Sequence, residues 1–221
     1  MNSLERWFVG RGMKQILKGR ERRKDQPEKG RLMASDMDTI VERTWQHYDE
    51  LLPLAPSFKH RGNTILMRNG VYSLALYRAL CEAVEDREHA TQLAGDVCWK
   101  GYEMSMKWPA VLAKLVHRDR KKRLDFLCRM GTKYRFSPPA YKVATRFENN
   151  TFFMDFTRCP ICDYFRDQGA EELEFFRNTW CKMDWAVIES MVEGPVRYER
   201  EHTLSHGDDI CDMRWIVLDE E

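Results

Sequence analysis

The hydrophobic period of the sequence changes at Pro138-Pro139. Before this dipeptide, apolar residues recur three and four positions apart, which is the spacing of amphipathic α-helices. After it, every second residue from Tyr141 to Phe147 falls on the same side of an extended chain, which predicts a half-buried β-strand. Helices followed by strands, rather than helices alternating with strands, predict an α+β fold with an antiparallel sheet.

Five helical segments are predicted in the first part of the chain. Their ranges are 2–18, 35–52, 63–84, 86–107 and 111–130. Ser35 or Asp36 is expected to cap the second segment, because short polar side chains accept hydrogen bonds from the free N–H groups of a first turn. Trp108-Pro109 is expected to separate the last two segments, because proline lacks an N–H group and clashes with the preceding turn.

The second part of the chain predicts an antiparallel β-β-α-β-β unit after the N-terminal helical region. Asn149-Asn150 is expected to form the turn between the first two strands, since asparagine tolerates positive φ. The expected strands are 141–147, 151–157, 196–204 and 210–218, and the expected helical ranges are 159–167 and 171–192, the latter as one helix or two. The expected division of the chain is a basic arm and linker over 1–32 and a single α+β domain over 33–221, helical over 33–137 and sheet-containing over 138–221.

The charges of the chain are unevenly distributed. The net charge is +1, but residues 1–32 contain ten Lys or Arg against four Asp or Glu. This arm predicts a short basic helix with a charged linker, and it is a candidate contact between copies of the chain in a homo-oligomer. The near-neutral total gives no electrostatic basis for nucleic-acid binding. The basic run 117–123 is expected to be a solvated face near the centre of the helix 111–130.

Two further properties limit the class of protein. The longest apolar runs are far shorter than the ~20 residues that span a bilayer, so no transmembrane segment is expected. Seven cysteines are an odd number in a chain too long to need disulfide staples, so reduced thiols in a cytoplasmic protein are expected. Cys81, Cys98 and Cys128 lie on apolar helical faces and are expected to pack as small hydrophobic residues.

Cys159 has the strongest local argument for chemical reactivity. It follows a predicted strand and precedes Pro160, which places it at the N-cap of a helix. The free N–H groups and the positive end of the helix dipole would stabilise a thiolate at that position. Arg158 adds a neighbouring positive charge. Cys159 is therefore a candidate nucleophile.

Two more cysteines carry acidic neighbours. Cys181 and Asp184 are three residues apart, so they are expected to share one face of a helix. Cys211 begins the last predicted strand, where alternation places Asp212 and Arg214 on the opposite face. Whether these thiols meet Cys159 depends on the tertiary fold, which the pattern alone does not determine.

These residues leave three chemistries open. The first is hydrolysis, in which His202 and His206 flank the last turn and exchange protons near neutral pH. The second is thiol–disulfide exchange at the Cys-Pro-Ile-Cys segment, whose local context is thioredoxin-like. The third is a site for zinc or iron, for which thiolates are suitable ligands. The thiols of that site would be Cys159, Cys162, Cys181 and Cys211.

The C-terminal third of the chain resembles the signature of the L-2-amino-thiazoline-4-carboxylic acid hydrolase family. The family pattern runs Cys-Pro, then Tyr-Phe and Gly, then a helical Cys before an acidic residue, and a closing Cys-Asp-hydrophobic-Arg strand. In this chain the pattern is carried by Arg158-Cys159-Pro160, Tyr164-Phe165, Gly169, Cys181 with Asp184, Glu199-Arg200, Thr203-Leu204, Gly207, and Cys211-Asp212 with Arg214. The second cysteine, Cys162, the loop around His206 and the basic arm depart from the pattern.

The resemblance implies a hydrolase without a cofactor that acts on a small heterocycle. It would add water to the ring carbon between sulfur and nitrogen of 2-amino-thiazoline-4-carboxylate and release N-carbamoyl-cysteine. The expected catalytic set is Cys159 (or an activated water) as nucleophile, Asp184 as base and His206 or Asp212 as acid, with Cys181 and Cys211 beside them. Arg158 or Arg214 would hold the substrate carboxylate, near His202. The alternative is a metal- or small-molecule-binding module that uses the cluster of Cys159, Cys162, Cys181 and Cys211. In a small-molecule-binding module these thiols would be buried as packing.

Overall fold

The computed structural model describes residues 3–84 and 86–218, with the side chains of residues 27, 184–187, 189 and 190 outside the description. Contacts along the chain divide it into two compact units. Unit 1 consists of Met1–Ala55 and Arg68–Gly101, and unit 2 consists of Pro56–Met67 and Tyr102–Glu221. Helices α3 (Arg61–Ala83) and α4 (Arg87–Val116) contribute residues to both units.

In unit 1 the basic arm is a helix that packs on the next helix. Helix α1 (Ser3–Leu17) contacts α2 (Ala34–Leu51), and its Met13 and Leu17 are each only 1% exposed. Arg6 donates to Asp49 of α2 over 2.8 Å, and Lys14 pairs with Asp38. Carboxylates of α2 therefore neutralise part of the arm's positive charge. The short 3-10 turns of this unit are η1 (Pro27–Lys29) and η2 (Leu52–Leu54).

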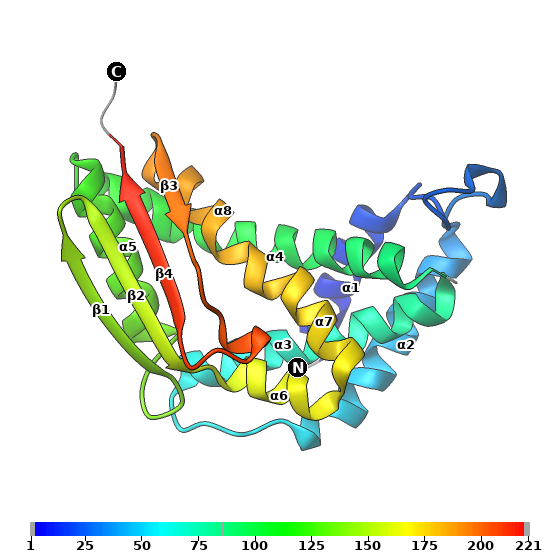
Figure 1. The fold of residues 1–221 in the computed structure, drawn as a ribbon. Coiled ribbons are helices and arrows are strands. Elements are labelled where there is room, and N and C mark those ends of the chain that lie inside the picture. Colours follow the sequence, from blue (N-terminus) through cyan, green and yellow to red (C-terminus); the bar gives the residue numbers. More distant parts are fainter. Residues whose placement is uncertain (1–2, 85, 219–221) are drawn as a thin grey trace. The chain divides into compact units, whose positions relative to one another are not determined.

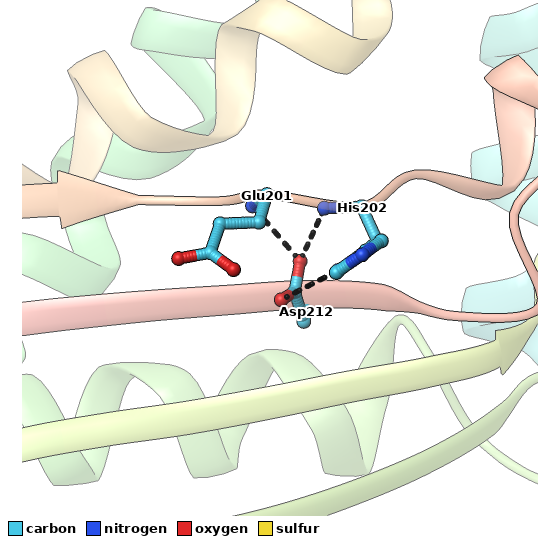
Figure 2. Close-up of side chains that lie close together, drawn as sticks. All are labelled: Glu201, His202 and Asp212. Atoms are coloured by element: carbon cyan, nitrogen blue, oxygen red, sulfur yellow. Dashed lines mark hydrogen bonds and ion pairs between the residues drawn. The ribbon is translucent and has the colours of Figure 1, made fainter.

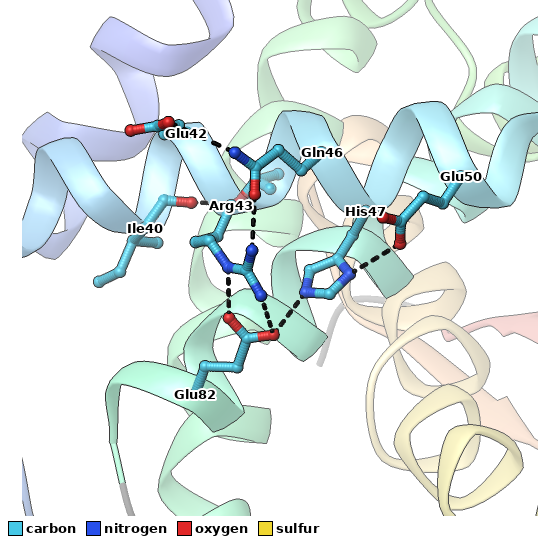
Figure 3. A network of polar contacts seen from close by, with 8 residues as sticks. Ile40, Glu42, Arg43, Gln46, His47, Glu50 and Glu82 are labelled. Carbon is cyan, nitrogen blue, oxygen red and sulfur yellow. Dashed lines mark hydrogen bonds and ion pairs between the residues drawn. The ribbon is translucent and has the colours of Figure 1, made fainter.

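A polar network joins α2 to the part of α3 that lies in unit 1 (Figure 3). Glu82 accepts from Arg43 through both carboxylate oxygens, over 2.7 and 3.0 Å. His47 Nε2 lies 2.7 Å from the same carboxylate. The hydrogen bond from Arg43, with the help of His47, lowers the pKa of Glu82. These contacts are on the surface, so they are expected to add little to the free energy of unfolding. Their main effect is to select which part of α3 lies against α2.

The start of α2 differs from the predicted cap. The helix begins at Ala34, one residue before Ser35, and Asp36 lies inside its first turn. The Asp36 carboxylate accepts from the backbone N–H of Met33 over 2.8 Å. An acidic residue at the third helical position commonly reaches back in this way. Asp36 therefore does help to cap the helix, but from inside the first turn and not from the predicted N-cap position.

Unit 2 contains a four-stranded antiparallel sheet, which confirms the predicted α+β class (Figure 1). Its strands are β1 (Lys142–Glu148), β2 (Thr151–Arg158), β3 (Val196–Glu199) and β4 (Cys211–Val217), in the order β1-β2-β4-β3. Asn149 and Asn150 both have positive φ, 47° and 65°, as the predicted tight turn between β1 and β2 requires. Exposure alternates along β1 as its sequence pattern predicts.

Three helices lie in the chain between strands β2 and β3. They are α6 (Pro160–Gln168), α7 (Ala170–Asn178) and α8 (Trp180–Val192), and the 3-10 turn η3 (Leu204–His206) precedes β4. The range 171–192 is therefore a pair of helices, one of the two forms expected. Helix α5 (Arg120–Tyr134) contacts β1, β2 and α8. Among the described residues, none of the helices is both long and apolar enough to cross a membrane.

The predicted break at Trp108-Pro109 is wrong. Helix α4 continues through Pro109 to Val116, and the next helix begins at Arg120. One proline removes a single helical hydrogen bond, and the exposed Trp108 beside it is free to adapt. The stronger boundary signal is Asp119, whose carboxylate accepts from the backbone N–H of Lys122 over 2.9 Å. The basic run 117–123 therefore lies at a helix junction rather than at a helix centre.

Strand β3 is shorter than predicted. The alternation of the sequence continues from Val196 to Leu204, but the paired strand ends at Glu199. Beyond it, the backbone N–H groups of Glu201 and His202 donate to the carboxylate of Asp212 instead of to a strand. A buried side chain from β4 thus replaces the sheet ladder at this point.

Candidate functional site

Unit 2 contains a cavity of about 70 Å³ that is lined by four of the chain's cysteines and by two arginines. We call it the thiol cavity. A single buried water occupies roughly 15 Å³ on the same measure, so the space suits a small molecule. Its lining includes the thiols Cys159, Cys162, Cys181 and Cys211, the polar residues Arg135, Arg200, Thr203 and Ser205, and aromatic side chains such as Phe136, Tyr141, Phe156 and Trp180.

Four cysteines reach this cavity from three elements of the fold. Cys159 is the N-cap of α6 and Cys162 lies in its first turn, because Pro160 starts the helix directly after β2. Cys181 lies in the first turn of α8, and Cys211 is the first residue of β4. None of the seven cysteines, all of which lie among the described residues, forms a disulfide bond. The convergence of these four thiols is what the sequence pattern left open.

The expected thiolate at Cys159 is not supported by the electrostatics of the cavity. Burial raises the pKa of the Cys159 thiol well above its ordinary value, and the neighbouring thiols raise it further. A hydrogen bond from the backbone of Cys162 acts in the opposite direction, but it is the weaker effect. Burial likewise raises the pKa of Cys162 to about 12, although Arg166 lies 3.5 Å from its sulfur. Both thiols are therefore protonated near neutral pH.

Arg200 is the main functional candidate that the sequence did not single out. It is half-buried, lines the cavity, and its buried Nη1 atom has no hydrogen-bond partner in the part of the chain that the structure describes. Burial would lower its pKa, but Tyr198, Cys211 and Cys181 together raise it, so the guanidinium stays charged. The available signal was its position: it continues the alternation of Val196 and Tyr198, whose side of the strand faces the interior.

Two arginines hold the turn that closes one side of the cavity. Arg166 of α6 donates to the carbonyl of Leu204 over 2.8 Å, and Arg177 of α7 donates to that of Ser205 over the same distance. The Ser205 hydroxyl lies 2.8 Å from the Thr203 hydroxyl and accepts from the thiol of Cys181 over 3.5 Å. The turn thus presents two hydroxyl groups next to a thiol.

The predicted residues Asp212 and His202 lie together (Figure 2), and Arg214 contacts the same carboxylate. None of the three is among the residues that line the thiol cavity. Asp212 is 6% exposed and accepts from the backbone N–H groups of Glu201 and His202, over 3.1 and 2.7 Å. His202 Nδ1 and Arg214 also contact its carboxylate, at 3.2 and 3.4 Å. Burial would raise the pKa of Asp212, but the hydrogen bonds of His202 and Glu201 lower it. Asp212 therefore anchors the segment that follows Arg200.

Three other predicted residues have different outcomes. Arg158 and His206 are exposed, and neither is among the residues that line the thiol cavity. Asp184 lies one turn after Cys181 in α8, but its side chain is outside the described residues. The assignment of Asp184 as a base therefore stays a prediction.

The arrangement of possible metal ligands is different from the predicted one. In the part of the chain that the structure describes, three ligand atoms come within 4.8 Å of one another at Glu201, His202 and Asp212. There the Asp212 carboxylate already accepts four hydrogen bonds. The four thiols do not form such a group among the described residues, so a zinc or iron site built from them stays a prediction without preformed geometry.

Unit 2 is thus an α+β domain with a thiol-lined cavity, of a size that suits a small molecule, beside a half-buried arginine. The sequence profile of the L-2-amino-thiazoline-4-carboxylic acid hydrolase family matches residues 65–215. The chain belongs to this family, which confirms the resemblance seen in its C-terminal third. The matched range contains every residue that lines the thiol cavity, from Leu66 to Met213.

Comparisons with other known proteins add little to this assignment. No curated protein matches the chain. Two solved structures of H-NOX domains from Shewanella oneidensis are similar to it. One, in the Fe(II)CO state, has 12% identity and a TM-score of 0.40, covering 83% of this chain and 94% of that one. The other, in the Fe(II)NO state, has 10% identity and a TM-score of 0.37, covering 84% and 96%. Likenesses this distant carry no functional argument.

Proposed function

We propose that the thiol cavity is the active site of a hydrolase that opens a small carboxylate-bearing heterocycle, such as 2-amino-thiazoline-4-carboxylate. The observation that carries the proposal is the convergence of four thiols and the half-buried Arg200 on one cavity inside the family-matched range. The reaction adds water to the carbon between sulfur and nitrogen. A carbon–oxygen bond forms, the carbon–sulfur bond breaks, and the released sulfur takes up a proton, which gives N-carbamoyl-cysteine.

Arg200 is the proposed anchor for the substrate carboxylate. Its buried Nη1 donor has no hydrogen-bond partner among the described residues, and a buried charged donor without a partner is costly. A carboxylate would satisfy this donor and form a charge-assisted hydrogen bond. Arg200 takes over the role expected of Arg158 or Arg214, because Arg158 is exposed and Arg214 contacts Asp212.

The raised thiol pKa values favour water over Cys159 as the attacking group. A thiol is a good nucleophile only as thiolate, and burial keeps the Cys159 and Cys162 thiols protonated. Neutral thiols still provide a polarisable wall for a ring that contains sulfur. Asp184 remains the proposed base for the attacking water, since it follows Cys181 by one helical turn.

Turnover by purified protein tests the proposal. The chain is incubated with 2-amino-thiazoline-4-carboxylate, and the new thiol is followed with a thiol reagent and identified by mass spectrometry. Replacing Arg200→Gln removes the charged donor and is expected to lower kcat/KM roughly 10- to 100-fold. The matched control is Arg158→Gln at an exposed position, which is expected to leave kcat/KM unchanged. Equal kcat/KM for Arg200→Gln and the wild type would refute the role of Arg200.

A small-molecule-binding module is the second candidate, and one observation favours it. Thiols held protonated by burial are compatible with simple packing around a bound ligand. Calorimetric titration with the same compound separates the two functions. Binding without release of a thiol would support the binding module and contradict the hydrolase.

A further inference from the structure

A second cavity adjoins the thiol cavity within unit 2. It has a volume of about 220 Å³, roughly three times that of the thiol cavity, and we call it the methionine cavity. The two cavities share five lining residues, which form the wall between them: Tyr102, Arg135, Phe136, Phe156 and Met213. The two cavities are therefore neighbours, and these five residues line both of them.

The methionine cavity is suited to an apolar group. Five methionines line it, among them Met106, Met130 and Met154, and methionine adapts its shape to irregular apolar ligands. Arg135 is the only charged residue among the described residues of its lining, and it is already engaged. Its guanidinium donates to Ser105 over 3.3 Å and lies 5.6 Å from the ring centre of Tyr102.

We propose that the site takes 2-substituted thiazoline-4-carboxylates whose substituent is an alkyl chain. Arg200 would hold the carboxylate and the thiol cavity the ring, while the alkyl chain on the carbon between sulfur and nitrogen would occupy the methionine cavity. This inference names the substrate class of the proposed function and rests on it. Water adds its oxygen to that carbon and a proton to the ring nitrogen. The carbon–sulfur bond then breaks, the sulfur takes the second proton, and the product is an N-acyl-cysteine.

A series of 2-methyl-, 2-butyl- and 2-hexyl-thiazoline-4-carboxylate tests the occupant of the methionine cavity. Turnover is followed by thiol release, and binding is measured separately by calorimetry. Each methylene group that enters an apolar cavity is expected to tighten binding about fourfold, until the cavity is full. The amino compound, which has no chain, is expected to bind more weakly than the butyl compound.

Gly131 of α5 offers a clean way to fill the methionine cavity. It lines that cavity but not the thiol cavity, and a Cβ atom built on it would lie at an ordinary contact distance of 3.9 Å from Phe136. Gly131→Leu is expected to abolish the gain from chain length while it leaves the affinity for the amino compound unchanged. Gly131→Ala controls for helix propensity, and Gly101→Leu adds the same side chain at an exposed helical glycine with open space around it.

A second variant, which enlarges the methionine cavity, tests the same inference without a change at Gly131. Met106→Ala, at a half-buried position that lines the methionine cavity alone, is expected to move the best chain length upward. Turnover of the amino compound with no gain from longer chains, in wild type and Met106→Ala alike, would overturn the inference while the proposed function stands. Affinity that rises with chain length and is lost in Gly131→Leu, but without turnover of any compound, would support the cavity assignment and refute the hydrolase.

Discussion

At the scale of single residues, the pKa of the Cys159 thiol depends more on burial than on the position of this residue at a helix N-terminus. A helix dipole stabilises a nearby charge by about 0.3–1 kcal/mol when that charge is exposed. Full burial shifts the pKa of an ionisable group by up to several units, and each unit corresponds to about 1.4 kcal/mol. The helix start at Cys159 was predicted correctly, but the burial that raises the pKa of its thiol is a tertiary property. Helix α8 and strand β4 bring Cys181 and Cys211 to the same cavity.

Because burial raises the pKa of the cavity thiols, these thiols are expected to be alkylated slowly. Cys159 and Cys162 are expected to react with iodoacetamide at least tenfold more slowly than a free cysteine at neutral pH, because the thiolate is the reactive form. The measurement is peptide mass spectrometry at timed intervals, with the urea-unfolded protein as the control in which all cysteines react. The rate is expected to rise steadily up to about pH 10. A plateau near neutral pH at Cys159 would show a stabilised thiolate instead.

Arg200 marks the limit of what the local pattern predicts at this scale. The alternation from Val196 to His202 puts Arg200 on the same face of a strand as Val196 and Tyr198, but it gives no reason to prefer this arginine over Arg158 or Arg214. The preference comes from the unpaired buried Nη1 and from the cavity beside it. Both are tertiary properties, because they require α6, α8 and β4 to meet.

At the scale of elements, the local signals predicted most of the helices and strands. The turn at Asn149-Asn150 and the start of α6 at Pro160 each depend on neighbouring residues, and both were correct. The end of β3 was wrong because it depends on Asp212, which lies more than ten residues away in β4. Element ends that are determined by a distant side chain cannot be read from periodicity.

Asp212 is therefore expected to act as a positioning residue. Asp212→Asn keeps the shape of the side chain but loses the charge that accepts four hydrogen bonds. It is expected to lower the free energy of unfolding by about 1–3 kcal/mol, and to raise KM more than it lowers kcat, since Arg200 precedes the anchored segment. The control is Asp163→Asn, whose carboxylate pairs with Arg166 at the surface. Unchanged stability and unchanged KM would contradict this role.

The same contact predicts how the anchor depends on pH. The hydrogen bond with Asp212 raises the pKa of His202. The stability contributed by His202 is therefore fully present below the ordinary pKa of histidine, and it is lost as pH rises through the raised pKa. The pKa of Asp212 is lowered, so its contribution is present above the ordinary pKa of aspartate and is lost as pH falls through the lowered value. The anchor is therefore strongest in the mildly acidic range between the two groups.

At the scale of the whole molecule, the chain buries several groups that ionise in alkaline solution. Burial raises the pKa of Cys98 and Cys162 to about 12, and that of Tyr77 to about 12 as well. Burial also raises the pKa values of Cys128, Cys159 and Tyr72. These groups belong to both units, so alkaline pH acts on the entire fold. In the unfolded chain the same thiols ionise near pH 9.

The stability of the protein is therefore expected to fall steeply above about pH 9. Between the unfolded and folded pKa values the unfolded chain binds fewer protons, so the free energy of unfolding decreases by about 1.4 kcal/mol per pH unit for each such group. Urea unfolding followed by tryptophan fluorescence at about pH 7.5, 9 and 10.5 measures the slope. Cys128→Ala removes one buried thiol and is expected to flatten the decline, although it lowers stability at neutral pH by creating a small cavity. A urea midpoint that stayed constant from about pH 8 to 10.5 would mean that these thiols are not buried as protonated groups.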